Sequence, residues 1–120
     1  MSATFPKHEK LKSRKAIKQL FEEGKTVTKY PVKLLWLPAQ QENTQTGFAV
    51  PKRTFKSAVT RNKIKRLMRE AYRLKRPENI NKNGAVYVLL FLYIGKDITP
   101  FKTVETAVIS VLQKLDVPVP

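Results

Sequence analysis

The sequence has no cysteine and a single histidine, His8, among its 120 residues. Disulfides and thiolate metal sites are therefore excluded, and the cysteine content does not indicate whether the protein's compartment is oxidising or reducing. A lone histidine near the N-terminus is far more often a bland surface residue than a general base. The nine acidic residues are scattered, and only Glu22 and Glu23 are adjacent, so no two-metal site is expected. The sequence predicts neither catalytic nor metal-ligating residues.

Glycine and long apolar runs are scarce as well. The four glycines never stand in the G-x-x-x-x-G-K order of a phosphate-binding loop. The longest apolar run, residues 85–94, is far shorter than the roughly 20 residues that span a bilayer as a helix. The first ten residues contain no apolar signal region. We therefore expect a cytoplasmic protein.

Basic residues are the abundant class. The 24 lysines and arginines oppose nine acidic residues, for a formal charge of +15. This balance favours a polyanionic partner. A membrane surface competes with nucleic acid for that role, but a peripheral membrane helix needs its apolar face free. The apolar face of the central helix is needed to cover a sheet, so we expect no membrane partner.

Residues 52–76 form a polar lead-in followed by one long helix, with eleven basic residues against one acid, Glu70. At about 100° per residue, the apolar residues fall on one side, as in a core-facing helix. The other side stacks like charges at i, i+4, which costs about 0.2–0.5 kcal/mol per pair. A nucleic-acid contact is therefore favoured over an idle solvated face. The apolar side is Ile64, Leu67, Met68, Ala71 and Leu74. The opposite side, here called the basic face, is Arg61, Asn62, Lys65, Arg66, Arg69, Arg73 and Arg76.

Ahead of this helix, the sequence predicts a helix and two strands. Residues 14–23 form the helix, with Ser13 as its cap and Gly24 as its stop. Residues 32–37 and 47–50 form strands joined by a polar connector of hairpin type. A second basic cluster surrounds the first helix: Lys10, Lys12, Arg14, Lys15 and Lys18.

After the central helix, the apolar residues 85–94 form a strand that is buried on both faces. It should pair in parallel with the preceding strand, because a helix separates the two. Thr99 caps a third helix that ends near Asp116. The expected fold class is α+β, a two-layer sandwich with three helices on one face of a small mixed sheet of three to four strands. Residues 1–120 form a single domain, with 1–12 and 117–120 extended or frayed.

Three aromatic residues lie among the basic clusters. Stacking of a nucleobase on such a ring is worth about 1–3 kcal/mol. Phe55 is expected in the core, and Tyr72 at the edge of the basic face. For Phe21, the core and base stacking are evenly balanced.

The run GFAVPKRTFKSAVTRNKIKRLMREAYR, residues 47–73, resembles the signature of the bacterial ribonuclease P protein component. A strand with glycine and a basic pair precede a helix that opens on Arg-Asn-x-x-Lys-Arg-x-x-Arg-Glu. The order of elements extends the resemblance over nearly the whole chain. It implies a monomeric basic protein bound to a catalytic RNA that removes 5′ leaders from precursor tRNA, with Mg²⁺ held mainly by the RNA. It also implies a left-handed β–α–β crossover, against the usual rule.

The resemblance assigns residues to two surfaces. The catalytic RNA would be contacted by Lys52, Arg53, Arg61, Asn62, Lys65, Arg66, Arg69 and Arg73. A groove between the first helix, the sheet and the central helix would hold the single-stranded leader, along Lys12, Ile17, Phe21, Lys33, Leu35 and Ala49. Lys63 stands where the family often has arginine. Its ammonium keeps the charge but lacks the planar guanidinium of arginine. Because Ile17 and Leu35 are aliphatic where relatives can carry aromatics, leader stacking would depend mostly on Phe21.

Three alternatives remain. A structural RNA-binding protein of the ribosome is the foremost. A DNA-binding protein that places the helix in a major groove is weaker. An autonomous nuclease ranks last, because the chain offers no catalytic groups.

Overall fold

The computed structural model describes the backbone of residues 10–38, 44–79 and 86–115, with side chains up to residue 74 in the second range and up to 114 in the third. His8, the connector at 39–43 and the tail at 117–120 lie outside the described residues. Three helices and one mixed four-stranded sheet confirm the predicted α+β class. The elements are α1 (Arg14–Glu23), β1 (Lys25–Lys29), β2 (Val32–Pro38), β3 (Gln45–Ala49), α2 (Ala58–Asn79), β4 (Tyr87–Tyr93) and α3 (Phe101–Leu115).

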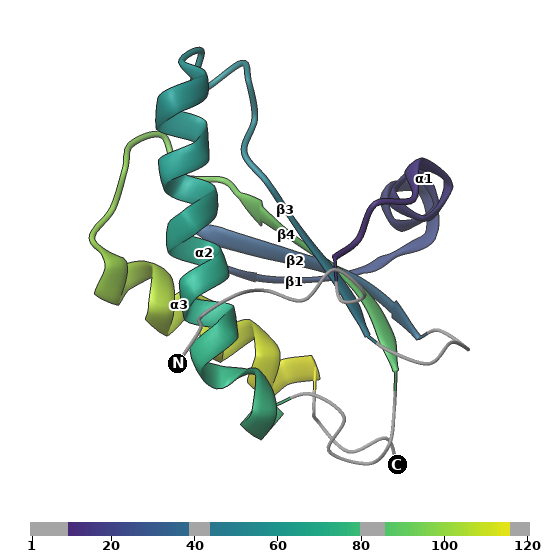
Figure 1. The fold of residues 1–120 in the computed structure, drawn as a ribbon. Coiled ribbons are helices and arrows are strands. Elements are labelled where there is room, and N and C mark those ends of the chain that lie inside the picture. Colours follow the sequence, from purple (N-terminus) through teal and green to yellow (C-terminus); the bar gives the residue numbers. More distant parts are fainter. Residues whose placement is uncertain (1–9, 39–43, 80–85, 116–120) are drawn as a thin grey trace.

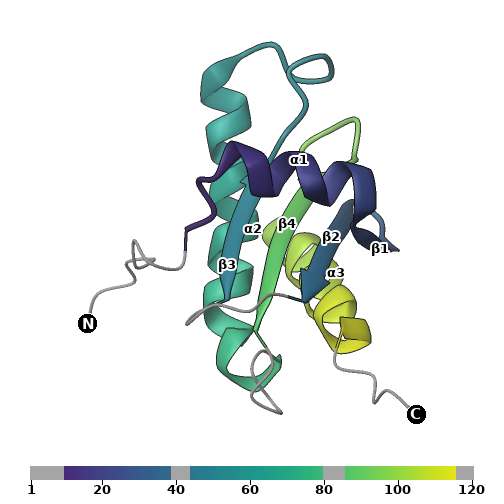
Figure 2. The same cartoon turned by 90° about the vertical axis from the view of Figure 1, so that its right-hand side faces the viewer.

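The strands lie in the order β1-β2-β4-β3 (Figure 1). β2 is antiparallel to β1 and β4, whereas β3 is parallel to β4, as predicted for strands that a helix connects. Figure 2 shows α2 behind the sheet, β3 to the left of β4, and the start of α2 at the top. β3 runs up to the start of α2, and the chain then passes behind the sheet to reach β4 on the right. This makes the β3–α2–β4 crossover left-handed, as the resemblance implies.

β1 was not predicted from the sequence, and the predicted hairpin between residues 32–37 and 47–50 is wrong. β1 reads KTVTK, in which only Val27 is apolar and half-buried, because this strand lies at an exposed edge of the sheet. The hairpin partner of β2 is β1, with Lys29 opposite Val32. β4, whose residues are apolar throughout, lies between β2 and β3.

Helices cover both faces of the sheet (Figures 1 and 2). α2 and α3 close the main core, where Ile64, Met68 and Ala71 are fully buried as predicted. α1 crosses the other face over a second, smaller core. The prediction of helices on one face only is therefore wrong. Cover on the second face is needed because β4 presents Leu90 and Leu92 there.

The ends of α1 agree with the prediction. The Ser13 hydroxyl accepts a hydrogen bond from the backbone N–H of Ala16 at 3.1 Å. Gly24 ends the helix in an extended conformation, with φ −64°, so left-handed geometry is not the reason for glycine. A Cβ at this position would lie 2.3 Å from the carbonyl oxygen of Leu20. The glycine is required by the close approach of the chain to the last turn.

The other two helices depart from the prediction at their ends. α2 continues three residues past residue 76, to Asn79. Leu74 is 45% exposed instead of buried. Thr99 does not cap α3. The carbonyl of Pro100 accepts from Val104, while the Thr99 hydroxyl lies 3.1 Å from the hydroxyl oxygen of Tyr93.

Candidate RNA interface

The basic face of α2 points away from the core. Asn62 and Arg66 are exposed, and Lys65, Arg69 and Arg73 are half-buried. Arg76 lies outside the described side chains. Arg73 forms an ion pair with Glu70, three residues before it. Among the described side chains, Lys65, Arg66 and Arg69 have no carboxylate partner. These three cations are therefore the part of the face that is open to an anion.

Arg61 has a structural role that the sequence analysis did not foresee. Its guanidinium donates hydrogen bonds to the carbonyl oxygens of Phe55, at 2.8 Å, and Lys56, at 2.9 Å. Phe55 is buried against Tyr93, with ring centroids 5.8 Å apart, which confirms its predicted place in the core. Arg61 thus fastens the lead-in to the first turn of α2. This lead-in carries the exposed residues Lys52 and Arg53.

A basic pocket of about 230 Å³ lies where α2 meets β3 and the segment ahead of α1. Four cations from separate parts of the chain surround it: Lys10, Lys12, Lys65 and Arg69. Leu11, Thr46, Gly47 and Phe48 complete the lining. The Arg69 guanidinium lies over the Phe48 ring, 5.9 Å from its centroid. Close cations with no carboxylate among the lining residues favour a phosphate group.

The segment at residues 10–12 is held against the edge of the sheet. Lys10 forms a parallel bridge with Thr46, and the Leu11 N–H donates to the Thr46 carbonyl at 2.9 Å. A Cβ on Gly47 would lie 3.3 Å from Leu11 and 3.3 Å from Leu90, so glycine allows the close approach. Lys10 is a candidate ligand that the sequence analysis did not select. Its membership of the second basic cluster is the sequence feature that could have identified it as a ligand.

Tyr72 does not lie at the edge of the basic face. Its side chain is 1% exposed, and its hydroxyl accepts a hydrogen bond from the Thr46 hydroxyl at 2.9 Å. Burial raises the pKa of Tyr72 to about 12, and the bond from Thr46 opposes that shift. The ring contacts Phe48 and Phe91, and therefore belongs to the main core.

The six residues predicted for the leader groove differ in exposure. Lys12 and Phe21 are exposed, Phe21 at 57%, which excludes the core alternative for this ring. Ile17, Lys33 and Ala49 are half-buried. Leu35 is 4% exposed and packs with Leu20 and Leu90 beneath α1, so little of its surface faces outward.

Strand register brings two of these residues into one row. Lys33 and Ala49 both lie opposite Leu92, on either side of β4. Register partners point to the same face of a sheet. Lys33, Leu92 and Ala49 therefore form a half-buried row on the face that carries α1.

Two absences hold over the described residues 10–38, 44–79 and 86–115. In these ranges, no three residues of the His, Cys, Asp and Glu types cluster as metal ligands. No helix within them is long and apolar enough to cross a membrane. What the described surface does offer is unpaired cations next to exposed or half-buried apolar groups.

Comparison with known proteins identifies the family of this chain. The model of the family Ribonuclease P matches residues 5–116. The ribonuclease P protein component of Porphyromonas gingivalis is 33% identical over 113 residues, which cover 88% of this chain and 82% of that protein. The corresponding protein of Dictyoglomus turgidum is 41% identical over 73 residues, 61% of this chain and 60% of that protein.

Solved structures show the same fold. The Staphylococcus aureus RNase P protein superposes with a TM-score of 0.74 at 20% identity, over 90% of this chain and 95% of that one. The RNase P protein from Thermotoga maritima gives 0.74 at 22% identity, over 88% and 96%. The matched family model spans almost all of the sequence, and the chain belongs to the ribonuclease P protein family.

Proposed function

We propose that this component of ribonuclease P, a tRNA-processing endoribonuclease, binds the catalytic RNA through the basic pocket and the adjoining basic face of α2. The observation that carries the proposal is the convergence of Lys10 and Lys12 with Lys65 and Arg69 around one cavity. Lys65 and Arg69 also repel each other at i, i+4. A phosphate between these cations relieves the repulsion and supplies the missing negative charge.

The same proposal assigns the 5′ leader of precursor tRNA to the face that carries α1. A single strand binds through ring stacking and phosphate contacts, largely without regard to sequence. The exposed ring of Phe21 supplies a stacking surface, and Lys12 and Lys33 supply charge. The row of Lys33, Leu92 and Ala49 offers a half-apolar floor. We propose that the protein acts as a monomer and that Mg²⁺ held mainly by the RNA carries the chemistry.

Family membership favours this role over the ribosomal alternative. Reconstitution separates the two. The protein is added to ribonuclease P RNA at low Mg²⁺, and cleavage of precursor tRNA is measured. We expect strong stimulation, because the protein's cations replace part of the metal that screens the RNA phosphates. No stimulation at any protein concentration would contradict the proposal.

A matched pair of double variants locates the interface. Lys65→Gln with Arg69→Gln removes two charges from the basic pocket. Lys96→Gln with Lys114→Gln removes two charges from exposed positions outside it. Each lost phosphate contact lowers the slope of log affinity against log salt by roughly 0.7–0.9. We expect the first pair to lower the slope and the second to leave it near the wild-type value. Equal effects of both pairs would show non-specific attraction only.

A further inference from the structure

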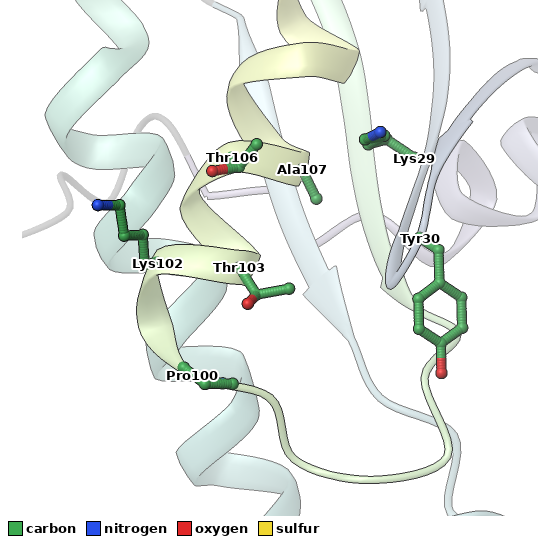
Figure 3. Close-up of a pocket in the computed structure, with 7 residues that line it drawn as sticks. All are labelled: Lys29, Tyr30, Pro100, Lys102, Thr103, Thr106 and Ala107. Atoms are coloured by element: carbon green, nitrogen blue, oxygen red, sulfur yellow. The ribbon is translucent and has the colours of Figure 1, made fainter.

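A larger cavity lies at the far side of the molecule from the basic pocket. It measures about 450 Å³ and is formed by the turn between β1 and β2 and by the start of α3 (Figure 3). This volume is in the range of roughly 300–1,000 Å³ that small-ligand sites occupy. Its lining residues are Lys29, Tyr30, Pro100, Lys102, Thr103, Thr106 and Ala107. None of them belongs to the surfaces assigned above.

The two cavities border opposite edges of the sheet. The basic pocket is lined by residues of β3, at one edge, and this cavity is lined by Lys29 of β1, at the other. Strands are spaced about 4.8 Å apart, so three steps across the sheet separate the edges by roughly 14 Å. A nucleotide held in the basic pocket therefore leaves this cavity uncovered.

The walls of the cavity are held in place by the strand and loop beneath them. The Ile94 N–H donates to the Pro31 carbonyl at 2.8 Å, which ties the β1–β2 turn to β4. Gly95 packs so closely under Pro31 that an added Cβ would lie 3.0 Å from it. The Tyr93 hydroxyl accepts from the Thr99 N–H at 3.2 Å, which fixes the approach to α3. A cavity with walls already in place loses little entropy when it binds a ligand.

The chemistry of the lining suits one nucleotide. Tyr30 is 61% exposed, so packing in the core does not explain why an aromatic residue stands at this position. Figure 3 shows the side chain of Lys29 reaching into the space between the turn and α3. Thr103 turns its methyl group toward the turn and its hydroxyl oxygen away from it, and Lys102 extends from the helix toward the other side. Among the described residues, Lys29 has no ion-pair partner. No acidic residue lines the cavity, and the first turn of α3 carries none.

We propose that this cavity binds an unpaired nucleotide of single-stranded RNA. The base stacks on the exposed ring of Tyr30. The phosphate is held by the Lys29 ammonium. Because the cavity shares no residue with the catalytic-RNA and leader surfaces, the inference does not depend on the proposed function. It gives the protein a further site that binds single-stranded RNA.

The test uses the full chain with Lys65→Gln and Arg69→Gln as background, so that binding at the basic pocket is weakened. A short oligouridylate is titrated against the ¹⁵N-labelled protein, and amide shifts are followed by NMR. We expect saturable shifts at Tyr30, Thr103 and Ala107. Shifts confined to α1 and α2 would overturn the proposal.

Variants of Tyr30 and Lys29 give a second readout. Tyr30→Ala should weaken oligouridylate binding at this site about tenfold, which lies within the range of one base–aromatic stack. Tyr30→Phe keeps the ring and should bind like the parent. Lys29→Gln should lower the salt slope by about 0.7, the value for one phosphate contact on a single strand. Unchanged affinity in Tyr30→Ala would overturn the proposal even if the amides shift.

The outcome is independent of the reconstitution experiment. Stimulated cleavage with no binding at Tyr30 would refute only the second site. Binding at Tyr30 without stimulation would refute only the proposed function. Both Tyr30 variants should unfold at the wild-type temperature, because the ring is exposed.

Discussion

Replacing Arg61 separates a structural role from an RNA contact within one motif. The Arg61 guanidinium donates to two carbonyl oxygens of the lead-in, at 2.8 and 2.9 Å. Hydrogen bonds from a charged donor are worth roughly 1.5–3 kcal/mol each. Because the site is half-exposed and water can replace part of the interaction, we expect Arg61→Ala to lower the free energy of unfolding by about 1–2 kcal/mol in total.

Arg66 is the matched control. It lies on the same helix, is exposed, and has no described partner. Arg66→Ala should change the free energy of unfolding by less than about 0.5 kcal/mol, as surface substitutions usually do. It should lower the salt slope of RNA binding by roughly 0.7–0.9, the value for one phosphate contact. Arg61→Ala should lower the slope by less, since its guanidinium is already engaged.

Urea unfolding and salt-dependent RNA binding measure the two effects on the same preparations. Arg61→Lys keeps the charge but loses the planar fork. We expect this variant to be destabilised while it keeps the wild-type slope. The reasoning is wrong if Arg61→Ala unfolds like wild type and loses as much slope as Arg66→Ala.

Four other substitutions test the packing and the groove. Burial raises the pKa of Tyr72 from 10.0 to about 12, so its contribution to stability is complete below pH 10 and is lost as the pH rises through 12. Unfolding curves across that window should lose on the order of 2–3 kcal/mol more for wild type than for Tyr72→Phe, and equal losses would contradict the assignment. Gly24→Ala should lower the free energy of unfolding by about 1–3 kcal/mol, since its Cβ would lie 2.3 Å from the Leu20 carbonyl oxygen; wild-type stability in urea would show that the α1–β1 junction relaxes freely. Phe21→Ala should leave stability within about 0.5 kcal/mol of wild type and weaken binding of a single-stranded leader about tenfold. Phe55→Ala, at a buried ring, should instead cost about 3–5 kcal/mol in unfolding.

Local sequence signals were sufficient to predict α1 and the buried side of α2. Ser13 and Gly24 bound α1 because capping and close approach involve only neighbouring residues. The spacing of Ile64, Met68 and Ala71 specifies the buried side of α2, since it depends on helix geometry alone. The parallel pairing of β3 with β4 follows from the helix between them.

The other strand pairings could not be predicted in this way. β1 carries one apolar residue, and nothing local distinguishes such an edge strand from a loop. The position of β4 between β2 and β3 depends on competition among strands for the sheet centre. Tyr72 faces inward because its ring packs against Phe48 and Phe91, from distant strands, and its hydroxyl accepts a hydrogen bond from Thr46.

The sequence by itself determined that this protein is basic, that it has no cysteine, and that one helix opposes an apolar side to a cationic one. These properties depend on composition and on the period of the helix. Only the tertiary structure decided how the cations are used. It brought Lys10 and Arg69 to the lining of one pocket, turned Arg61 back onto the lead-in, and left Tyr30 exposed in the lining of another cavity. Such placements depend on contacts between segments far apart in the chain, and those contacts form only when the sheet and helices pack together.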